Sequence, residues 1–177
     1  MNNGKISVRY ARALYNTAKE SGCDKEIYEQ LGVFVKLYEE NMAEMNAALD
    51  NPVIGKEDRR NLLLTAMGSE ISPCLKDFVD LVVERHREDK MYLMAKKYEE
   101  LYREENKILQ TRITTATQLN PATLEEIRKS VEHDFDANVE MSETIDPSLI
   151  GGFVLDVGDE RYDASIARQL RLLKKNL

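Results

Sequence analysis

The spacing of apolar residues changes near residue 107, and this change constrains the fold more than any other feature of the sequence. Before it, apolar side chains recur every three or four residues, which is the spacing of an amphipathic helix. After it, they alternate with polar ones, which is the spacing of a strand with one buried face. We therefore expect an α+β protein, with a helical bundle over residues 1–105 and a smaller domain over residues 106–177.

The pattern in residues 1–105 predicts five or six helices. Gly22 is well placed to end the first in a left-handed conformation, and Ser72 to cap the fifth ahead of Pro73. The chain must leave helical geometry at Asn51, because the residue before a proline is pushed toward extended conformations. The expected helices run from Ser7 to Ser21, from Lys25 to Glu40, up to about Leu49, from Lys56 to Met67, from Pro73 onward, and from about Asp89 to Glu105.

The second part is expected to form a β-α-β-β-α domain of about 70 residues, a size at which a partner often adds stability. Its first strand holds Leu109 to Thr115, and its first helix begins at Pro121 after a capping Asn120. Two further strands are expected around residues 139–145 and 153–157. A second helix closes the domain.

The stretch from Gly151 to Leu170 contains several sequence signals for local structure. Gly151 and Gly152 remove two side chains where another backbone could approach closely. Gly158 and Asp159 are typical of a turn. Either Asp163 or Ser165 can cap the helix that follows. The apolar stripe of that helix consists of Ile166, Leu170, Leu173 and Leu177.

Charge and composition exclude several functions. The net charge of −7 argues against nonspecific binding of nucleic acid, which needs a clustered basic face. No apolar run reaches the roughly 20 residues of a membrane-spanning helix, so direct membrane insertion is not expected. Cys23 and Cys74 have no partner motif and are expected to be reduced thiols. The basic residues Arg161, Arg168, Arg171, Lys174 and Lys175 near the end either complement a helix dipole or dock on an acidic helical partner.

The sequence contains no motif for catalysis or cofactor binding that we recognise. The Gly-Lys pairs at Gly4 and Gly55 lack the remainder of a phosphate-binding loop, so nucleotide is not expected to bind by that route. His86 and His133 have no second imidazole or thiolate at metal-ligand spacing. No nucleophile lies beside a base in the sequence. We therefore expect no catalytic residue, no cofactor and no metal.

Several segments resemble one family. The stretch GGFVLDVGDERYDASIARQL resembles the carboxy-terminal signature of the delta subunit of bacterial F-type ATP synthases, the family of the mitochondrial oligomycin-sensitivity-conferring protein. RYARALYNTA is similar to the opening helix of that family, LDNPVI to its Leu-x-x-Pro break, and IDPSLIGG to its Asp-Pro-x-Leu-x-Gly-Gly element. Ala164 stands where the family often has glycine, which leaves the cap geometry there open.

The resemblance implies a non-catalytic stator subunit, with a six-helix bundle on the catalytic head and a C-terminal domain on the peripheral stalk at the cytoplasmic face of the bacterial inner membrane. The bundle would receive the N-terminal helix of an alpha subunit in a groove between its first and fifth helices. The expected groove residues are Tyr10, Ala13, Leu14, Ala18, Phe78, Val79 and Val82, each of which could instead belong to the bundle core.

The C-terminal domain would meet the C-terminal end of the b-subunit dimer. The residues expected to form this contact or the family signature are Gly151, Gly152, Gly158, Asp159, Asp163, Ser165, Arg168 and Arg171. Two other classes of protein stay open at this point. One is an unrelated cytoplasmic two-domain adaptor, and the other is an enzyme whose site is assembled from scattered residues.

Overall fold

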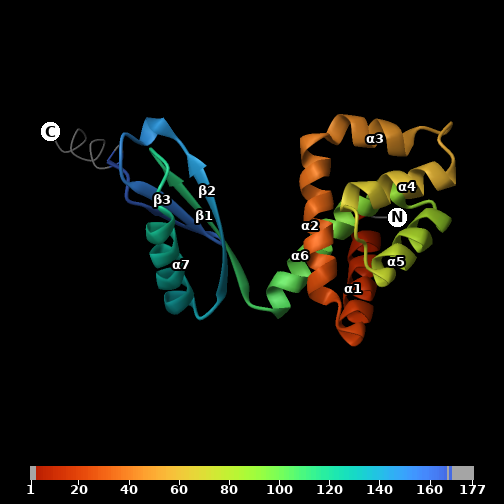
Figure 1. Ribbon diagram of the computed structural model, residues 1–177, viewed down its shortest axis with the longest axis horizontal. Helices are drawn as coiled ribbons and strands as arrows, with labels where there is room; N and C mark the ends of the chain where they lie inside the picture. Colours follow the sequence, from red (N-terminus) through yellow and green to blue (C-terminus); the bar gives the residue numbers. More distant parts are fainter. Residues whose placement is uncertain (1–2, 167, 169–177) are drawn as a thin grey trace. The chain divides into compact units, whose positions relative to one another are not determined.

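The computed structural model describes residues 3–166 and 168. Contacts within it divide the chain into two units, Met1–Glu104 and Glu105–Leu177. The first unit is helical, and every strand in the described part of the chain belongs to the second (Figure 1). The α+β class expected from the change in periodicity is therefore confirmed.

Six α-helices and one 3-10 turn form the first unit. They are α1 Asn3–Ser21, α2 Asp24–Glu40, α3 Met42–Asp50, α4 Lys56–Met67, α5 Pro73–Glu84, η1 Glu88–Lys90 and α6 Met91–Glu105. The expected ends are confirmed by geometry, since Gly22 has a φ of 67° and the backbone at Asn51 is extended. The Ser72 side chain accepts a hydrogen bond from the backbone of Leu75, as a cap should.

The core of this unit is built around Tyr98 of α6. Its side chain is fully buried, and its hydroxyl donates to the carbonyl oxygen of Asp24 at 3.0 Å. The ring lies edge-on to that of Tyr15, with centroids 5.7 Å apart. Burial raises the pKa of the Tyr98 hydroxyl, so it remains a donor. This one residue thereby joins α6 to α1 and to the start of α2.

Glu99, the next residue of α6, is a buried carboxylate. It is 5% exposed, and Arg103 approaches it with Nη2 at 3.3 Å from Oε2. A side chain at Gly32 of α2 would lie 3.6 Å from the other carboxylate oxygen, so α2 covers it. Burial raises the pKa of Glu99, and the nearby charges of Arg103 and Lys96 only partly oppose this.

We expect Glu99→Gln to alter how stability depends on pH. The pKa of Glu99 is raised in the folded protein, so protonated Glu99 stabilises the wild-type fold at pH values below its ordinary pKa of 4.5. This stabilisation is lost as the pH rises through the pKa that Glu99 has in the folded protein. The neutral amide has no such loss. In urea unfolding from acidic to neutral pH, the free energy of unfolding of the variant should therefore increase relative to that of wild type as the pH rises. Glu100→Gln, on the exposed side of α6, is the control. Parallel curves of unfolding free energy against pH for wild type and Glu99→Gln would contradict the prediction.

The second unit contains a four-stranded mixed sheet in the order β2-β1-β3-β4. Its elements are β1 Ile108–Thr115, α7 Pro121–Phe135, β2 Asn138–Ile145, η2 Pro147–Leu149, β3 Phe153–Val157 and β4 Glu160–Asp163. β1 is parallel to β2 and antiparallel to β3, and β3 is antiparallel to β4. Helix α7 covers one face of the sheet, where Val131 packs with Val139 and Val157 (Figure 1).

The expected β-α-β-β-α order needs one correction, because the described part of this unit has a fourth strand. β4 follows the Gly158–Asp159 turn, which joins two strands into a hairpin and does not lead directly into a helix. Val157 pairs with Glu160 across this turn, and Gly158 has a φ of 56°. Of the closing helix, only Ile166 and Arg168 belong to the described residues, and Leu170, Leu173 and Leu177 lie outside them.

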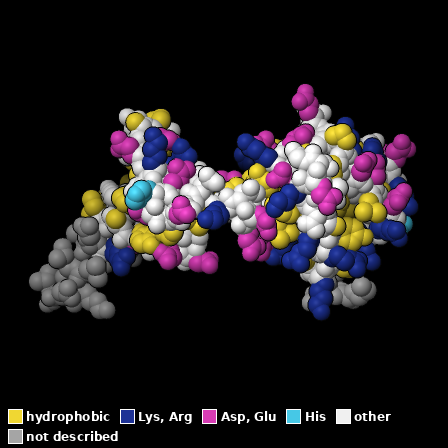
Figure 2. All heavy atoms as spheres, turned by 90° about the horizontal axis from the view of Figure 1, so that it is seen from below, with side chains coloured by type: hydrophobic (Ala, Val, Ile, Leu, Met, Phe, Trp, Pro, Cys, Tyr) yellow, Lys and Arg dark blue, Asp and Glu magenta, His cyan; other side chains and the backbone are white. Residues whose placement is uncertain are grey.

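Charges are mixed over both units. Figure 2 shows basic and acidic side chains interspersed over much of the visible face, with hydrophobic side chains between them. Among the described helices, none combines the length and apolar character that crossing a membrane requires.

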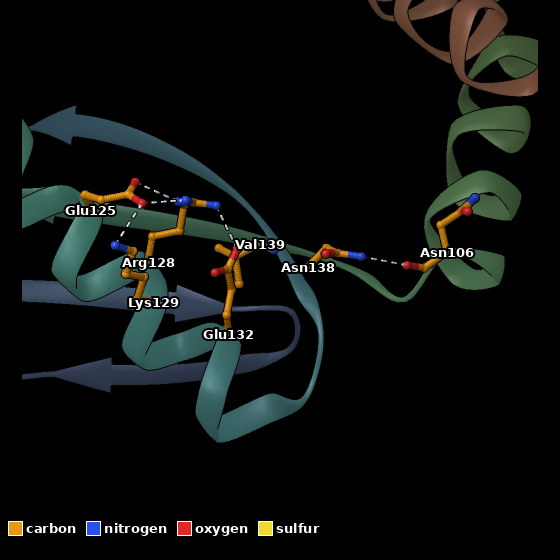
Figure 3. A network of polar contacts seen from close by, with 7 residues as sticks. All are labelled: Asn106, Glu125, Arg128, Lys129, Glu132, Asn138 and Val139. Atoms are coloured by element: carbon orange, nitrogen blue, oxygen red, sulfur yellow. Dashed lines mark hydrogen bonds and ion pairs between the residues drawn. The ribbon is translucent and has the colours of Figure 1, made fainter.

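A polar network fixes α7 to the strand that follows it. The carboxylate of Glu132 accepts hydrogen bonds from Arg128 at 2.8 Å and from the backbone N–H of Val139 at 3.4 Å (Figure 3). Arg128 also donates to Glu125, and the Asn138 side chain donates to the carbonyl oxygen of Asn106 at 3.3 Å. The start of β2 is thus held both to its own helix and to the segment that begins β1.

Candidate functional site

A groove with a volume of about 1130 Å³ lies between α1 and α5. Its apolar lining comes from one stripe on each helix. On α1 this stripe holds Ile6, Tyr10, Ala13 and Leu14, and on α5 it holds Phe78 and Leu81. Residues three and four apart share a helix face, so both helices present a continuous surface to the groove.

Two contacts show that α1 and α5 run in opposite directions along the groove. The rings of Tyr10 and Phe78 meet edge-on with centroids 6.3 Å apart. Beyond the other end of α1, Cys23 lies close enough to Cys74, at the start of α5, to add to the rise that burial causes in the pKa of the Cys74 thiol. The start of one helix therefore lies beside the end of the other.

The charges that line the groove are separated by sign because of this antiparallel arrangement. Arg9 near the start of α1 shares one end of the groove with Arg85 and Arg87, which follow α5. Glu26 and Asp77 line the opposite end. The groove thus offers an apolar middle between a basic and an acidic end, a pattern that suits an amphipathic helix.

The seven expected groove residues divide between the groove and the core. Tyr10, Ala13, Leu14 and Phe78 line the groove. In contrast, Ala18, Val79 and Val82 have no exposed surface and belong to the bundle interior. Helix face alone does not separate the two sets, because Ala18 lies four residues after Leu14 and Val82 lies four residues after Phe78. Packing of the neighbouring helices decides which of these positions stay accessible.

Sequence reasoning missed two apolar residues of the groove, Ile6 and Leu81. Leu81 is 42% exposed and lines the groove one turn from Asp77. A signal was present, because Leu81 stands among charged residues on the otherwise polar side of α5. An apolar side chain in that position has nothing of its own fold to cover it and indicates a contact surface.

A second apolar surface lies at one end of the sheet in the C-terminal unit. Ile145 and Phe153 both pair with Thr115, so they flank it on the same face. Ile150 and Ile166 lie close by, because the backbone N–H of Ile166 donates to the carbonyl oxygen of Gly151 at 3.0 Å. All four apolar side chains are exposed, and Ile150 is the most exposed at 68%.

The expected stalk and signature residues fall into two groups at opposite ends of β3. Gly158 and Asp159 form the β3–β4 turn at one end, where Gly158 donates to the carbonyl oxygen of Gln110. The other group lies beside the second apolar surface and comprises Gly151, Gly152, Asp163, Ser165 and Arg168. Arg171 lies outside the described residues.

Of the two candidate caps, Ser165 is the cap and Asp163 supports it. The Ser165 hydroxyl accepts from the backbone N–H of Arg168 at 3.2 Å and donates to the Asp163 carboxylate at 2.6 Å. Asp163 also accepts from the backbone of Ser165. These hydrogen bonds lower the pKa of Asp163. Ala164, where the family often has glycine, fits beside Phe153, whose carbonyl oxygen accepts its N–H at 2.9 Å.

Within residues 3–166 and 168, no group of three histidines, cysteines or carboxylates is placed to hold a metal ion. The groove instead has the chemistry of a docking surface, with a broad apolar lining and charges at its two ends.

Comparison with known proteins gives a single answer. The model of the ATP synthase delta (OSCP) subunit family matches residues 6–177. Proteins named ATP synthase subunit delta from Phocaeicola vulgatus and Parabacteroides distasonis are 37% and 33% identical to this chain. The alignments cover 97% of this chain and 93% of the first relative, and 100% of this chain and 98% of the second.

A solved structure shows the same fold. It is a chain in the cryo-EM structure of the Toxoplasma gondii mitochondrial ATP synthase hexamer, with a TM-score of 0.68 and 19% identity. The match covers 97% of this chain and 96% of that one. The motifs at both ends of the sequence, the two-unit architecture and these matches agree, and the chain belongs to the ATP synthase delta (OSCP) subunit family.

Proposed function

We propose that this chain, a stator component of the peripheral stalk of F-type ATP synthase, is a non-catalytic connector. In this proposal its helical unit receives the amino-terminal helix of an alpha subunit in the groove between α1 and α5. Its C-terminal unit binds the C-terminal end of the b-subunit dimer. The protein would then lie peripherally at the cytoplasmic face of the membrane, held there by the complex.

The observation that supports the alpha-subunit contact is the apolar groove with charged ends. Its lining extends along α1 from Ile6 to Ser21, which at 1.5 Å per residue is about 22 Å, or roughly four helical turns. Exposed Leu81 and partly buried Tyr10 offer anchors of the kind that dominate helix-in-groove binding. The opposed charges at the ends would set the direction in which the helix docks.

The second apolar surface supports the stalk contact. Ile145, Ile150, Phe153 and Ile166 gather at one end of the sheet and are exposed in the described structure. Exposed apolar side chains that lie together are typical of interaction sites, whereas isolated ones are not. Arg168 next to this surface adds a cation that could face an acidic partner.

Two contacts, one on each unit, can give a high combined affinity even if each contact alone has a modest affinity. Once one partner has bound, the second contact is effectively intramolecular, so the combined affinity exceeds either one. This suits a stator, which must hold the catalytic head against torque. It also explains why the chain needs two interaction surfaces and no active site.

We expect Ala13→Glu to weaken binding of the alpha-subunit helix at least tenfold, which corresponds to about 1.4 kcal/mol. Ala13 is exposed and lines the groove, so the substitution buries a charge only in the complex. Glutamate is also a good helix former, so α1 should keep its stability. The measurement is calorimetric titration with a peptide of about 20 residues from the N-terminus of the same organism's alpha subunit, long enough to span the groove.

Asn16→Glu is the matched control, because it makes the same charge change on an exposed position of α1 outside the groove. It should bind the peptide as wild type does. Binding of a C-terminal b-subunit segment should be the same in all three proteins, since the second apolar surface is untouched. If wild type does not bind the alpha peptide, or if both variants bind it equally, the groove does not have this role.

A further inference from the structure

Ile150, which follows the 3-10 turn η2, has an unusual backbone conformation. Among residues 3–166 and 168, it is the one β-branched residue whose φ is positive. Its φ of 65° and ψ of −33° lie outside the right-handed and extended regions that such residues occupy. Glycine is the usual residue for a positive φ at the end of a helical turn. The backbone at Ile150 is therefore strained.

The strain arises because the chain is fixed on both sides of Ile150. Before it, the backbone N–H of Asp146 donates to the carbonyl oxygen of Thr115 at 2.7 Å, which ties the start of η2 to the end of β1. After it, the carbonyl oxygen of Gly151 accepts from the backbone N–H of Ile166 at 3.0 Å. Ile150 has to join these two fixed segments, whatever its own conformational preference.

The fold gains little from the Ile150 side chain. That side chain is 68% exposed, so it buries little apolar area within its own chain. A glycine in this place would remove the strain, as glycine does at Gly152, where φ is 74°. Strained residues persist where the surrounding structure over-determines them, and they gather at functional sites. An exposed isoleucine held in this way indicates a contact with another molecule.

Ile150 belongs to the second apolar surface together with Ile145, Phe153 and Ile166, and it is the most exposed of the four. Binding energy in protein interfaces is concentrated in a few large side chains, and the contacts around them mainly exclude water. A fixed turn that exposes one β-branched side chain also reduces the entropy lost when that side chain is immobilised in a complex. These properties are those of an anchor.

The charge next to this surface favours an acidic partner. Residues 166–177 contain four basic residues and no acidic one, whereas the whole chain has a net charge of −7. Arg168, the first of the four, is exposed. The nearby carboxylates of Asp146 and Asp163 already accept hydrogen bonds from backbone N–H groups of their own turns. Opposed charge would orient an acidic segment over the apolar surface.

We propose that Ile150 is the anchor of the stalk contact, and that its partner is an amphipathic helix with an apolar stripe and an acidic flank at the C-terminal end of the b subunit. This inference rests on the proposed function of the C-terminal unit. The apolar stripe covers Ile150 and its three apolar neighbours, and the acidic flank faces Arg168. The free protein bears the strain at Ile150, and burial of the side chain in the complex offsets it.

The first arm of the test measures the strain by comparing alanine with glycine. In an ordinary position glycine is less stable than alanine, because its unfolded chain is more flexible. We expect the opposite order at Ile150, since only Ile150→Gly removes the side chain from a positive φ. Hydrogen exchange over β1, followed by mass spectrometry, should therefore be slower in Ile150→Gly than in Ile150→Ala.

The matched pair for this arm is Ile145→Ala and Ile145→Gly. Ile145 belongs to the same apolar surface but lies in the regular strand β2, without a positive φ. The glycine variant should therefore exchange faster than the alanine variant at this position. The ordinary order at both Ile145 and Ile150 would overturn the strain.

The second arm is calorimetric titration of the full chain with a peptide from the C-terminal segment of the same organism's b subunit. Both Ile150 variants should bind this peptide at least about tenfold more weakly than wild type does. Val53→Ala removes an apolar side chain that is 87% exposed in the helical unit, and it should bind as wild type does. The wild-type affinity should fall as the salt concentration rises, because the partner is acidic.

Different results would contradict different parts of the proposal. Ile150 variants that bind as well as wild type would overturn the anchor and leave the stalk contact standing. An affinity that is independent of salt would overturn the acidic partner. If wild type does not bind the peptide, the stalk contact itself fails. A wild-type dimer that Ile150→Ala dissociates in sedimentation experiments would assign the surface to a second copy of this chain instead.

Discussion

Arg59→Ala is expected to destabilise the helical unit by about 3 to 5 kcal/mol, the usual effect of leaving a buried charge without its partner. Arg59 of α4 forms an ion pair with Glu88 of η1, with Nη1 2.9 Å from Oε1. The Glu88 side chain is only 4% exposed and that of Arg59 17%. A second nitrogen of Arg59 donates to the carbonyl oxygen of Asn51 at 2.8 Å.

The loss is large because this side chain joins three segments. It connects the end of α3, the first turn of α4 and the 3-10 turn that leads into α6. Neither Nε of Arg59 nor Oε2 of Glu88 has a hydrogen-bond partner in the described structure, so the pair is already incompletely satisfied. Removing the guanidinium leaves the whole carboxylate buried and unpaired.

A double replacement distinguishes a buried charge from lost packing. If both residues become methionine, no charge remains, and stability should return to within about 1 to 2 kcal/mol of wild type. Urea unfolding followed by circular dichroism measures both variants, since the six helices dominate the signal. Equal destabilisation of the single and double variants would show that the ion pair is not the cause.

The sequence predicted the helices of the first unit well because local signals define them. Amphipathic spacing, the caps at Gly22 and Ser72 and the break at Asn51 are all properties of short segments. The Arg59–Glu88 pair could not be predicted in this way. It brings together residues 29 positions apart, and the charged face of any solvated helix looks the same in sequence.

β4 was missed because it lacks the signal that defines the other strands. Its residues, Glu160 to Asp163, include no aliphatic side chain, and the first three are exposed. β4 lies at the edge of the sheet, where only one side of the backbone is paired. Such a strand is determined by the hairpin turn and by pairing with β3, not by burial of alternate side chains.

The division between groove and core was only partly predictable. The two stripes on α1 are adjacent, and Leu14 belongs to both, since it lines the groove and is 4% exposed. At about 100° per residue, Ala18 lies roughly 80° around the helix from Tyr10 and roughly 140° from Ala13. Sequence periodicity identifies the apolar side of a helix, but packing against α2 and α6 decides which part of it stays accessible.

The sequence predicts a close backbone approach at Gly152, and the structure has one there. Gly152→Ala should therefore destabilise the C-terminal unit. Gly152 has a φ of 74°, and a side chain there would lie 2.4 Å from the carbonyl oxygen of Ala164. The left-handed conformation alone costs roughly 1–2 kcal/mol for other residues. Displacing a packed backbone adds about 1–3 kcal/mol. We therefore expect the C-terminal unit to lose about 2 to 5 kcal/mol of stability.

Gly151→Ala is the matched control at the adjacent position. A side chain at Gly151 would meet Cδ1 of Ile166 at 2.8 Å, but that atom is the end of a flexible, exposed side chain that can rotate away. Hydrogen exchange followed by mass spectrometry reports the two units separately. Gly152→Ala should lose protection over β3 and β4 while the helical unit is unchanged, because the hydrogen bonds from Ala164 to Phe153 and from Ile166 to Gly151 must both shift. Equal protection in the two variants would mean that the segment at Ala164 can retreat without cost, and that the double glycine serves some purpose other than this close approach.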